Sequence, residues 1–159
     1  MNSILSGAIA AELALLAREV DTPVAPFGFG VDLHCTQDLD ELMPEVDDPQ
    51  TVLAQALARR LDCPRGALAD DRNYGIDLRE YLNRGLTTDE IRSLAGTVRS
   101  ELTKDDRVDT VRVIVTPSSI GDALRLSLSI APRDSVAGGP FELILAVTDG
   151  GIHVEELRR

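Results

Sequence analysis

Hydrophobic residues recur every three or four positions in two segments of the chain, as they do on one face of an α-helix. The first segment begins at Asp48-Pro49, where an aspartate can cap a helix and a proline at the first helical position loses no hydrogen bond that the helix needs. Its apolar face consists of Val52, Leu53, Ala56, Leu57 and Leu61. The second begins at Thr87-Thr88-Asp89-Glu90, which is a capping box, and its apolar face consists of Ile91, Leu94, Ala95, Val98 and Leu102. We therefore expect a helix over each segment.

From Val108 the period changes to two, which is the alternation of a strand with one buried face. Three runs show it, with apolar residues at Val111, Val113 and Val115, at Leu124, Leu126, Leu128 and Ile130, and at Phe141, Leu143, Leu145 and Val147. Pro117 to Gly121 predicts a turn, and Asp149-Gly150 predicts a hairpin before a last short strand. A sheet with one apolar face needs a cover, which the preceding helices supply. The chain is therefore predicted to be α+β, a two-layer sandwich of helices packed on a three- or four-stranded, mainly antiparallel sheet.

The beginning of the chain does not follow this pattern. Residues 2–20 predict a helix that is apolar over most of its surface, with Leu13 and Leu16 among its apolar residues. Two prolines soon after it leave the chain extended, and residues 27–33 then alternate like a short strand before an acidic connector. We divide the chain into an N-terminal helix and extended arm at 1–36 and an α+β domain at 37–159. The arm is expected to attach to a partner, although packing on its own domain is the open alternative.

Acidic residues outnumber basic ones, and the excess lies in one region. The formal net charge is −11, and residues 1–50 contribute most of it, with ten acidic residues against one arginine. A nucleic-acid partner is not expected, because it would require a basic surface. A basic protein partner fits the acidity, and so does a simple gain in solubility. The segment from Ile4 to Leu16 follows no positive charge and contains Glu12, so we expect neither a signal peptide nor a membrane span.

Residues that commonly carry catalysis or bind metals do not form a recognisable pattern. Cys35, Cys63 and the two histidines have no metal-ligand spacing, and both cysteines are expected to be reduced. No serine lies in a nucleophile-elbow sequence. The acidic residues between 38 and 48 offer carboxylate pairs for glycoside hydrolysis, but they have few apolar neighbours and no aromatic platform for a sugar. The sequence predicts no catalytic residue, no metal and no cofactor.

The segment from Leu53 to Leu82 joins a helix to a charged connector that contains glycines. Five arginines alternate in it with five acidic residues, namely Arg59, Arg60, Arg65, Arg72 and Arg79 with Asp62, Asp70, Asp71, Asp77 and Glu80. Arginine favours forked pairing with carboxylates. These charges form either a mesh of salt bridges within the chain or an interface that fixes the registry of neighbouring subunits. The sequence leaves both interpretations open.

Several pieces of this segment occur together in a known family. They are Gln55-Ala56, Arg60-Leu61, Pro64-Arg65-Gly66, Tyr74-Gly75-Ile76-Asp77-Leu78 and, after the second helix, Arg107-Val108. In this order, over about residues 48–131, the chain resembles the baseplate wedge family of contractile phage tails and contractile injection systems. These small wedge proteins were once called lysozyme-like and are now regarded as sheath initiators. Two positions depart from the family pattern: Asp105-Asp106-Arg107 stands where Glu-Pro-Arg is common, and Cys63 where threonine is usual.

The resemblance implies a structural role and no enzymatic one. A protein of this kind would lie in the baseplate, link the wedge or hub to the tube, and offer a sheet edge that the first ring of sheath subunits extends by strand addition. The implied partners are the tail sheath protein, larger baseplate wedge proteins, and tube or hub proteins. Several copies would assemble per particle in the cytoplasm of the producing cell, without contact to nucleic acid or membrane. We expect the partner interfaces to include Arg60, Arg65, Gly66, Tyr74, Gly75, Asp77 and Arg107, with Leu13 and Leu16 in the arm and Asp149 and Gly150 at the hairpin that is the expected sheet edge.

Two other functions stay open. A peptidoglycan hydrolase of the tail is suggested by the former lysozyme-like name, and an assay of peptidoglycan release tests it. A free-standing adaptor of a cellular complex is the second alternative, and neighbouring genes for sheath, tube and wedge proteins would argue against it.

Overall fold

The computed structural model of the protein describes residues 29–33, 45–119, 121–133 and 138–159. Two of the predicted helices lie among these residues, and both are present. Helix α2 spans Pro49–Asp62, and the carboxylate of Asp48 caps it by accepting a backbone N–H of its first turn at 2.9 Å. Helix α3 spans Thr88–Leu102 and has the complete capping box, in which the side chains of Thr87 and Glu90 each accept the backbone N–H of the other residue. The polar residues at both helix starts therefore act as the sequence predicts.

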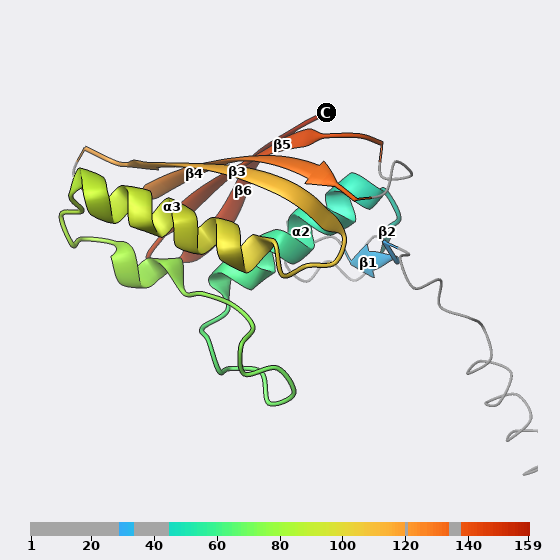
Figure 1. Ribbon diagram of the computed structural model, residues 1–159, viewed down its shortest axis with the longest axis horizontal. Coiled ribbons are helices and arrows are strands. Elements are labelled where there is room, and N and C mark those ends of the chain that lie inside the picture. The colour runs from blue at the N-terminus through green and yellow to red at the C-terminus, as the bar shows by residue number, and fades with distance from the viewer. Residues whose placement is uncertain (1–28, 34–44, 120, 134–137) are drawn as a thin grey trace, which may run out of the picture.

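Four strands form an antiparallel meander in the order β3-β4-β5-β6. They span Val108–Pro117, Leu124–Pro132, Phe141–Thr148 and Gly151–Arg158. The predicted tight turn at Asp149-Gly150 joins β5 to β6. Figure 1 shows both helices on the same face of this sheet, where α3 packs on β3 and α2 packs on β6. The fold is therefore α+β, with helices packed on an antiparallel sheet, as predicted.

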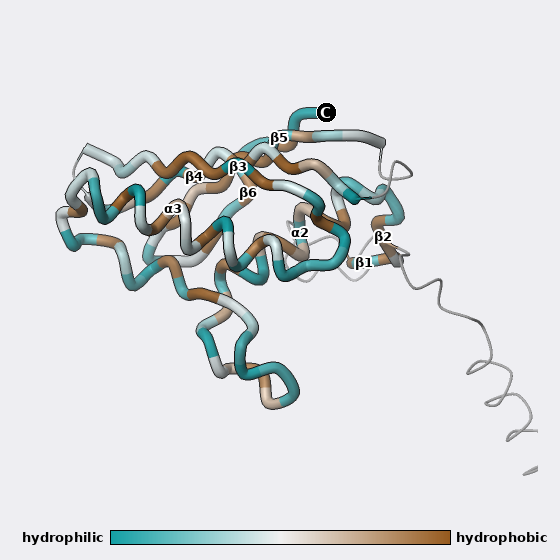
Figure 2. Tube along the Cα trace, viewed as in Figure 1, coloured by the Kyte–Doolittle hydropathy of each residue, from teal (hydrophilic) through white to brown (hydrophobic). Residues whose placement is uncertain are grey.

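The core lies between the two layers and is almost entirely aliphatic. On β4 and β5 alternate side chains face the helices, and Leu128 and Leu145 have no exposed surface. The helices contribute buried residues at spacings of three and four, which are Leu53, Leu57 and Leu61 on α2 and Leu94, Val98 and Leu102 on α3. Each fully buried leucine stabilises the fold by about 2 kcal/mol relative to an exposed one. Figure 2 shows the hydrophobic colour recurring along the strands and both helices.

A second, two-stranded sheet is formed by β1, Asp32–Leu33, and β2, Glu45–Val46, which pair antiparallel. The sequence predicts a strand over residues 27–33, and β1 occupies the end of that range. It does not predict β2, because two residues within an acidic connector are too few to show an alternation. Phe29 packs against the core, and an ion pair between Asp32 and Arg59 joins β1 to α2.

Several predictions concern residues outside the described part of the chain. They are the helix over residues 2–20 with Leu13 and Leu16, the extended stretch that follows it, and Cys35. These stay predictions, as does the boundary between an arm and a domain. No helix among the described residues is long and apolar enough to cross a membrane.

Between α2 and the short 3-10 helix η1, Leu78–Tyr81, the chain leaves the body of the domain and returns to it. Residues 64–73, here called the connector loop, are all exposed. Figure 1 shows this loop projecting on the side of the helices, away from the sheet. It belongs to the segment from Leu53 to Leu82, for whose charged residues the sequence leaves two interpretations open.

Candidate functional site

A buried glutamate, Glu101, lies where the connector loop returns to the domain. It is the penultimate residue of α3 and is only 1% exposed. It shares the buried face of that helix with Val98 and Leu102. A carboxylate in such a place is costly unless its oxygens are paired.

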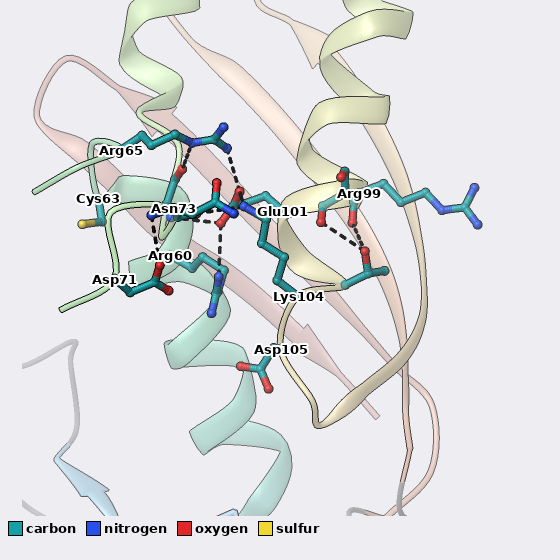
Figure 3. A network of polar contacts seen from close by, with 12 residues as sticks. Arg60, Cys63, Arg65, Asp71, Asn73, Arg99, Glu101, Lys104 and Asp105 are labelled. Carbon is teal, nitrogen blue, oxygen red and sulfur yellow. Dashed lines mark hydrogen bonds and ion pairs between the residues drawn. The ribbon is translucent and has the colours of Figure 1, made fainter. Parts of the chain in front are cut away.

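Four donors from three parts of the chain pair the carboxylate of Glu101 (Figure 3). Its Oε1 accepts the backbone N–H of Gly75 at 2.9 Å and the guanidinium of Arg60, on α2, at 3.1 Å. Its Oε2 accepts the guanidinium of Arg65, in the connector loop, at 2.9 Å. The same oxygen accepts Nζ of Lys104, just after α3, at 2.7 Å. The carboxylate therefore joins α2, α3 and both ends of the connector loop.

The electrostatic balance at Glu101 favours the charged form. Burial is the largest single influence and raises its pKa, because a charge loses hydration in the interior. The bonds from Lys104, from the N–H of Gly75 and from Arg60 lower the pKa and together outweigh burial. The net pKa lies below the usual value for glutamate, so Glu101 is an anion at neutral pH and attracts the surrounding cations.

Two further hydrogen bonds close the base of the connector loop. The Nε of Arg65 donates to the carbonyl of Gly75 at 3.3 Å, which bridges the two ends of the loop directly. The Nζ of Lys104 donates to the carbonyl of Asn73 at 2.8 Å. Arg65 and Lys104 therefore each pair with the buried carboxylate and also donate a hydrogen bond to a backbone carbonyl at the base of the loop.

The two ends of the connector loop also touch through their backbones. Gly75 has φ +88, and a Cβ at this position would lie 2.2 Å from the carbonyl oxygen of Cys63. Only glycine fits both the conformation and the space. The guanidinium of Arg60 lies 4.1 Å from the ring centre of the adjacent Tyr74, which adds a cation–π contact. The sequence Tyr74-Gly75 is thus explained by close packing at the base of the loop.

Two forked arginine–aspartate pairs lie near this cluster. Arg107 donates to both oxygens of Asp105 at 2.9 and 2.8 Å, and Arg79 donates to both oxygens of Asp77 at 2.8 and 2.9 Å. Burial alone would raise the pKa of Asp105, but the bonds from Arg107 lower it. The pKa of Asp77 is lowered, above all by Arg79. Both pairs join residues two positions apart, so they stiffen the backbone locally.

Four predicted interface residues meet at the buried carboxylate or beside it: Arg60, Arg65, Tyr74 and Gly75. The contacts that they make are with groups of their own chain, as expected for a mesh of salt bridges within the chain. Whether any of them also contacts a partner stays a prediction.

The other predicted interface residues that the structure describes do not bond to this carboxylate. Gly66 is exposed in the connector loop, and Asp149 and Gly150 are exposed in the turn between β5 and β6. Arg107 and Asp77 take part in the forked pairs described above. The structure therefore does not gather the predicted residues into one surface.

Sequence reasoning misses the central residue, Glu101, and its neighbour Lys104. One signal was present. Glu101 follows Leu94 by seven positions and Val98 by three, so it falls on the apolar face of the second predicted helix. An acidic residue on a buried face requires cations nearby, and the connector supplies them.

The described residues contain no group of three or more His, Cys, Asp and Glu that could hold a metal ion. The half-buried Cys63 has a free thiol. A hollow of about 570 Å³ is lined by residues of α3, β3 and β4 and by Pro140.

Comparisons with known proteins find a related fold and no family. No protein-family model matches the sequence, and no curated protein matches it. Among solved structures, the fold resembles that of a protein from Geobacter sulfurreducens described as a "putative tail lysozyme". The TM-score is 0.52 and the identity is 15%, over 60% of this chain and 86% of that chain. At this identity the likeness shows a common fold.

Proposed function

We propose that this protein is a structural, non-enzymatic component of the baseplate of a contractile tail or injection system. In this proposal it links the wedge or hub to the tube and nucleates sheath assembly by accepting a strand of the sheath protein. The sequence resemblance to sheath initiators supports the proposal. The fold shared with the protein described as a "putative tail lysozyme" agrees with it.

The observation that carries the proposal is the free edge of the sheet at β3. This strand spans Val108–Pro117, and among the described residues it pairs only with β4. A free edge presents unpaired N–H and C=O groups to which an extended segment of another chain can pair. The hollow that β3 lines together with α3, β4 and Pro140 includes the small residues Ala95 and Gly96 of α3, which leave room for side chains of an added strand. Arg99 and Arg112 also line it and have no ion-pair partner in the described ranges, so they favour acidic residues on that strand.

The opposite edge, at β6, is less suited to strand addition. Both edge pairings contain a register shift, but that of β3 lies at the start of the strand, between Val108 and Thr110, whereas that of β6 lies in the middle of the strand, opposite Ile144 and Leu145. A bulge in the middle of an edge strand twists the edge and interrupts regular pairing. The end of β6 is occupied by ion pairs, of Arg158 with Glu142 and of Arg159 with Asp48. We therefore propose β3 as the acceptor, in preference to the hairpin at Asp149-Gly150 that the sequence suggested.

The carboxyl groups support the non-enzymatic part of the proposal. A glycosidase needs an acid with a raised pKa, which protonates the leaving group. Every described carboxyl whose pKa departs from its ordinary value departs downwards. The most buried of them, Glu101, has both oxygens occupied by donors of its own chain. Peptidoglycan hydrolysis is the rival function, because it is what the name of the Geobacter protein suggests.

Photo-cross-linking in the producing cell tests the proposed acceptor edge. A photoreactive amino acid is placed at Arg112 on β3 or at His153 on β6, both of which are exposed. We expect an adduct with the sheath protein from position 112 and none from position 153. Sheath adducts from position 153 alone would move the acceptor edge to the hairpin. The absence of sheath adducts from both positions would contradict nucleation by strand addition.

A further inference from the structure

We propose that the outer end of the connector loop, Ala67–Asp70, is a docking tip that inserts into a shallow apolar pocket of a second protein. Leu68 is the residue that enters the pocket, and a basic side chain at the pocket rim faces Asp70. The tip is a different surface from the sheet edge, and docking there does not depend on strand addition to β3.

The first observation is that the base of the loop is held firmly although nothing within the loop is buried. The ends of the loop are fixed by the buried carboxylate of Glu101, by Arg65, by Lys104 and by the close approach of Gly75 to Cys63. A loop that serves only as a connection needs no such anchoring, since surface loops tolerate mobility. A fixed loop, by contrast, loses little conformational entropy when it binds, which favours affinity.

The second observation is that the loop is also shaped internally at each end of the tip. Before the tip, the N–H of Ala67 donates to the carbonyl of Pro64 at 3.1 Å. After it, the carboxylate of Asp71 accepts the N–H of Asn73 at 2.9 Å, and the carbonyl of Asp71 accepts the N–H of Tyr74 at 3.2 Å. These two turns present the residues between them at the outermost part of the loop.

The third observation is the chemistry of the tip. Exposed loop tips are usually made of small polar residues and glycine, whereas this one has three consecutive apolar residues, Ala67, Leu68 and Ala69. Leu68 is one of the large hydrophobic side chains that the described part of the chain leaves exposed, at 39%. Figure 2 shows a short hydrophobic stretch at the outer end of an otherwise hydrophilic loop. A partner that buries these side chains removes apolar surface from water, and this burial contributes favourably to the free energy of binding.

The polar groups of the tip define the rest of the partner surface. In the described part of the chain, the backbone groups of Leu68, Ala69 and Asp70 have no hydrogen-bond partner, and neither does the carboxylate of Asp70. A pocket that covers the apolar side chains must therefore supply hydrogen bonds at its rim, and a lysine or arginine opposite the aspartate suits the charge. The partner is thus a protein with a small apolar pocket and a basic rim.

The test uses the full chain in the cells that produce it. A photoreactive phenylalanine analogue is placed at Leu68 and, as the matched control, at Asp122, which is exposed in the turn between β3 and β4. We expect position 68 to give an adduct with one other protein, mapped to a site with apolar and basic residues, and position 122 not to give it. Adducts only with other copies of this chain, or no adduct beyond the control level, would overturn the proposal.

Substitutions then test the chemistry of the contact. We expect Leu68→Asp to reduce co-purification of the cross-linked protein by roughly tenfold or more, with an unchanged melting temperature because this side chain lies outside the core. Asp70→Lys should also weaken co-purification. An acidic substitution at the mapped basic residue of the partner should restore co-purification with the Asp70→Lys protein. Unchanged co-purification of the Leu68→Asp protein, or a lowered melting temperature, would contradict a docking role. An adduct at position 68 together with none at position 112 would leave this inference intact and count only against strand addition.

Discussion

The carboxylate of Glu101 accepts the backbone N–H of Gly75 at 2.9 Å, across 26 positions of sequence. This one bond joins the end of helix α3 to the point where the connector loop re-enters the domain. Because Glu101 is 1% exposed, the contact exchanges little with water. The segment from Leu53 to Leu82 is therefore tied to helix α3 by a residue outside it.

Replacing the buried carboxylate with an amide should destabilise the fold. Glu101→Gln keeps the shape and removes the charge that pairs with Arg60, Arg65 and Lys104, so we expect a loss of about 2 to 4 kcal/mol in the free energy of unfolding. Urea denaturation measures it. The matched control is Asp89→Asn, which breaks the exposed pair with Arg92 and should have no measurable effect. Equal stability of both variants would show that the cluster contributes nothing to the fold.

The same residue predicts a pH dependence. In the unfolded chain Glu101 titrates near its ordinary value of about 4.5, and in the folded protein its pKa is lower. In the interval between these values the unfolded state binds more protons, so stability rises with pH. The contribution is complete above about pH 4.5 and is lost as the pH falls through the folded pKa. Denaturation curves of Glu101→Gln should therefore depend less steeply on pH in the acid range than those of the original protein, and identical slopes would contradict the shift.

Substitutions at Gly66 and Gly75 distinguish the cost of backbone strain from the cost of a steric clash. Gly66 and Gly75 have nearly the same φ, +86 and +88, but a Cβ at Gly66 meets nothing within 4 Å. We expect Gly66→Ala to cost about 1 kcal/mol from strain alone. Gly75→Ala should cost at least about 3 kcal/mol, because the new atom would overlap the Cys63 carbonyl and disturb the bond to Glu101. If thermal melting shows equal losses, the close approach at Gly75 is not a determinant of stability.

Periodicity in the sequence predicts the helices and strands, because their buried residues recur at regular spacing. Val98 and Leu102 lie at helical spacing, and Leu126 and Leu128 alternate, so each element can be identified from its own residues. The site could not be predicted in the same way. The partners of Glu101 lie 26 to 41 positions away, except for Lys104, and only the tertiary fold brings them together. For the same reason the sequence could not decide whether the arginines face a partner or the same chain.

Purified protein should release no soluble fragments from peptidoglycan. The described carboxyl groups whose pKa is shifted are shifted towards the charged form, and none has the raised pKa that a catalytic acid requires. A dye-release assay beside a known muramidase measures this. Release that is abolished by Glu101→Gln, in a variant that stays folded, would establish a hydrolase and refute the non-enzymatic proposal.

The most direct test of the structural role is electron microscopy of particles from producing cells that lack this protein. The proposal predicts assembled tubes without an ordered sheath at the baseplate, and recovery of sheathed particles when the full chain is supplied again. Sheathed particles of normal length and order in its absence would contradict it.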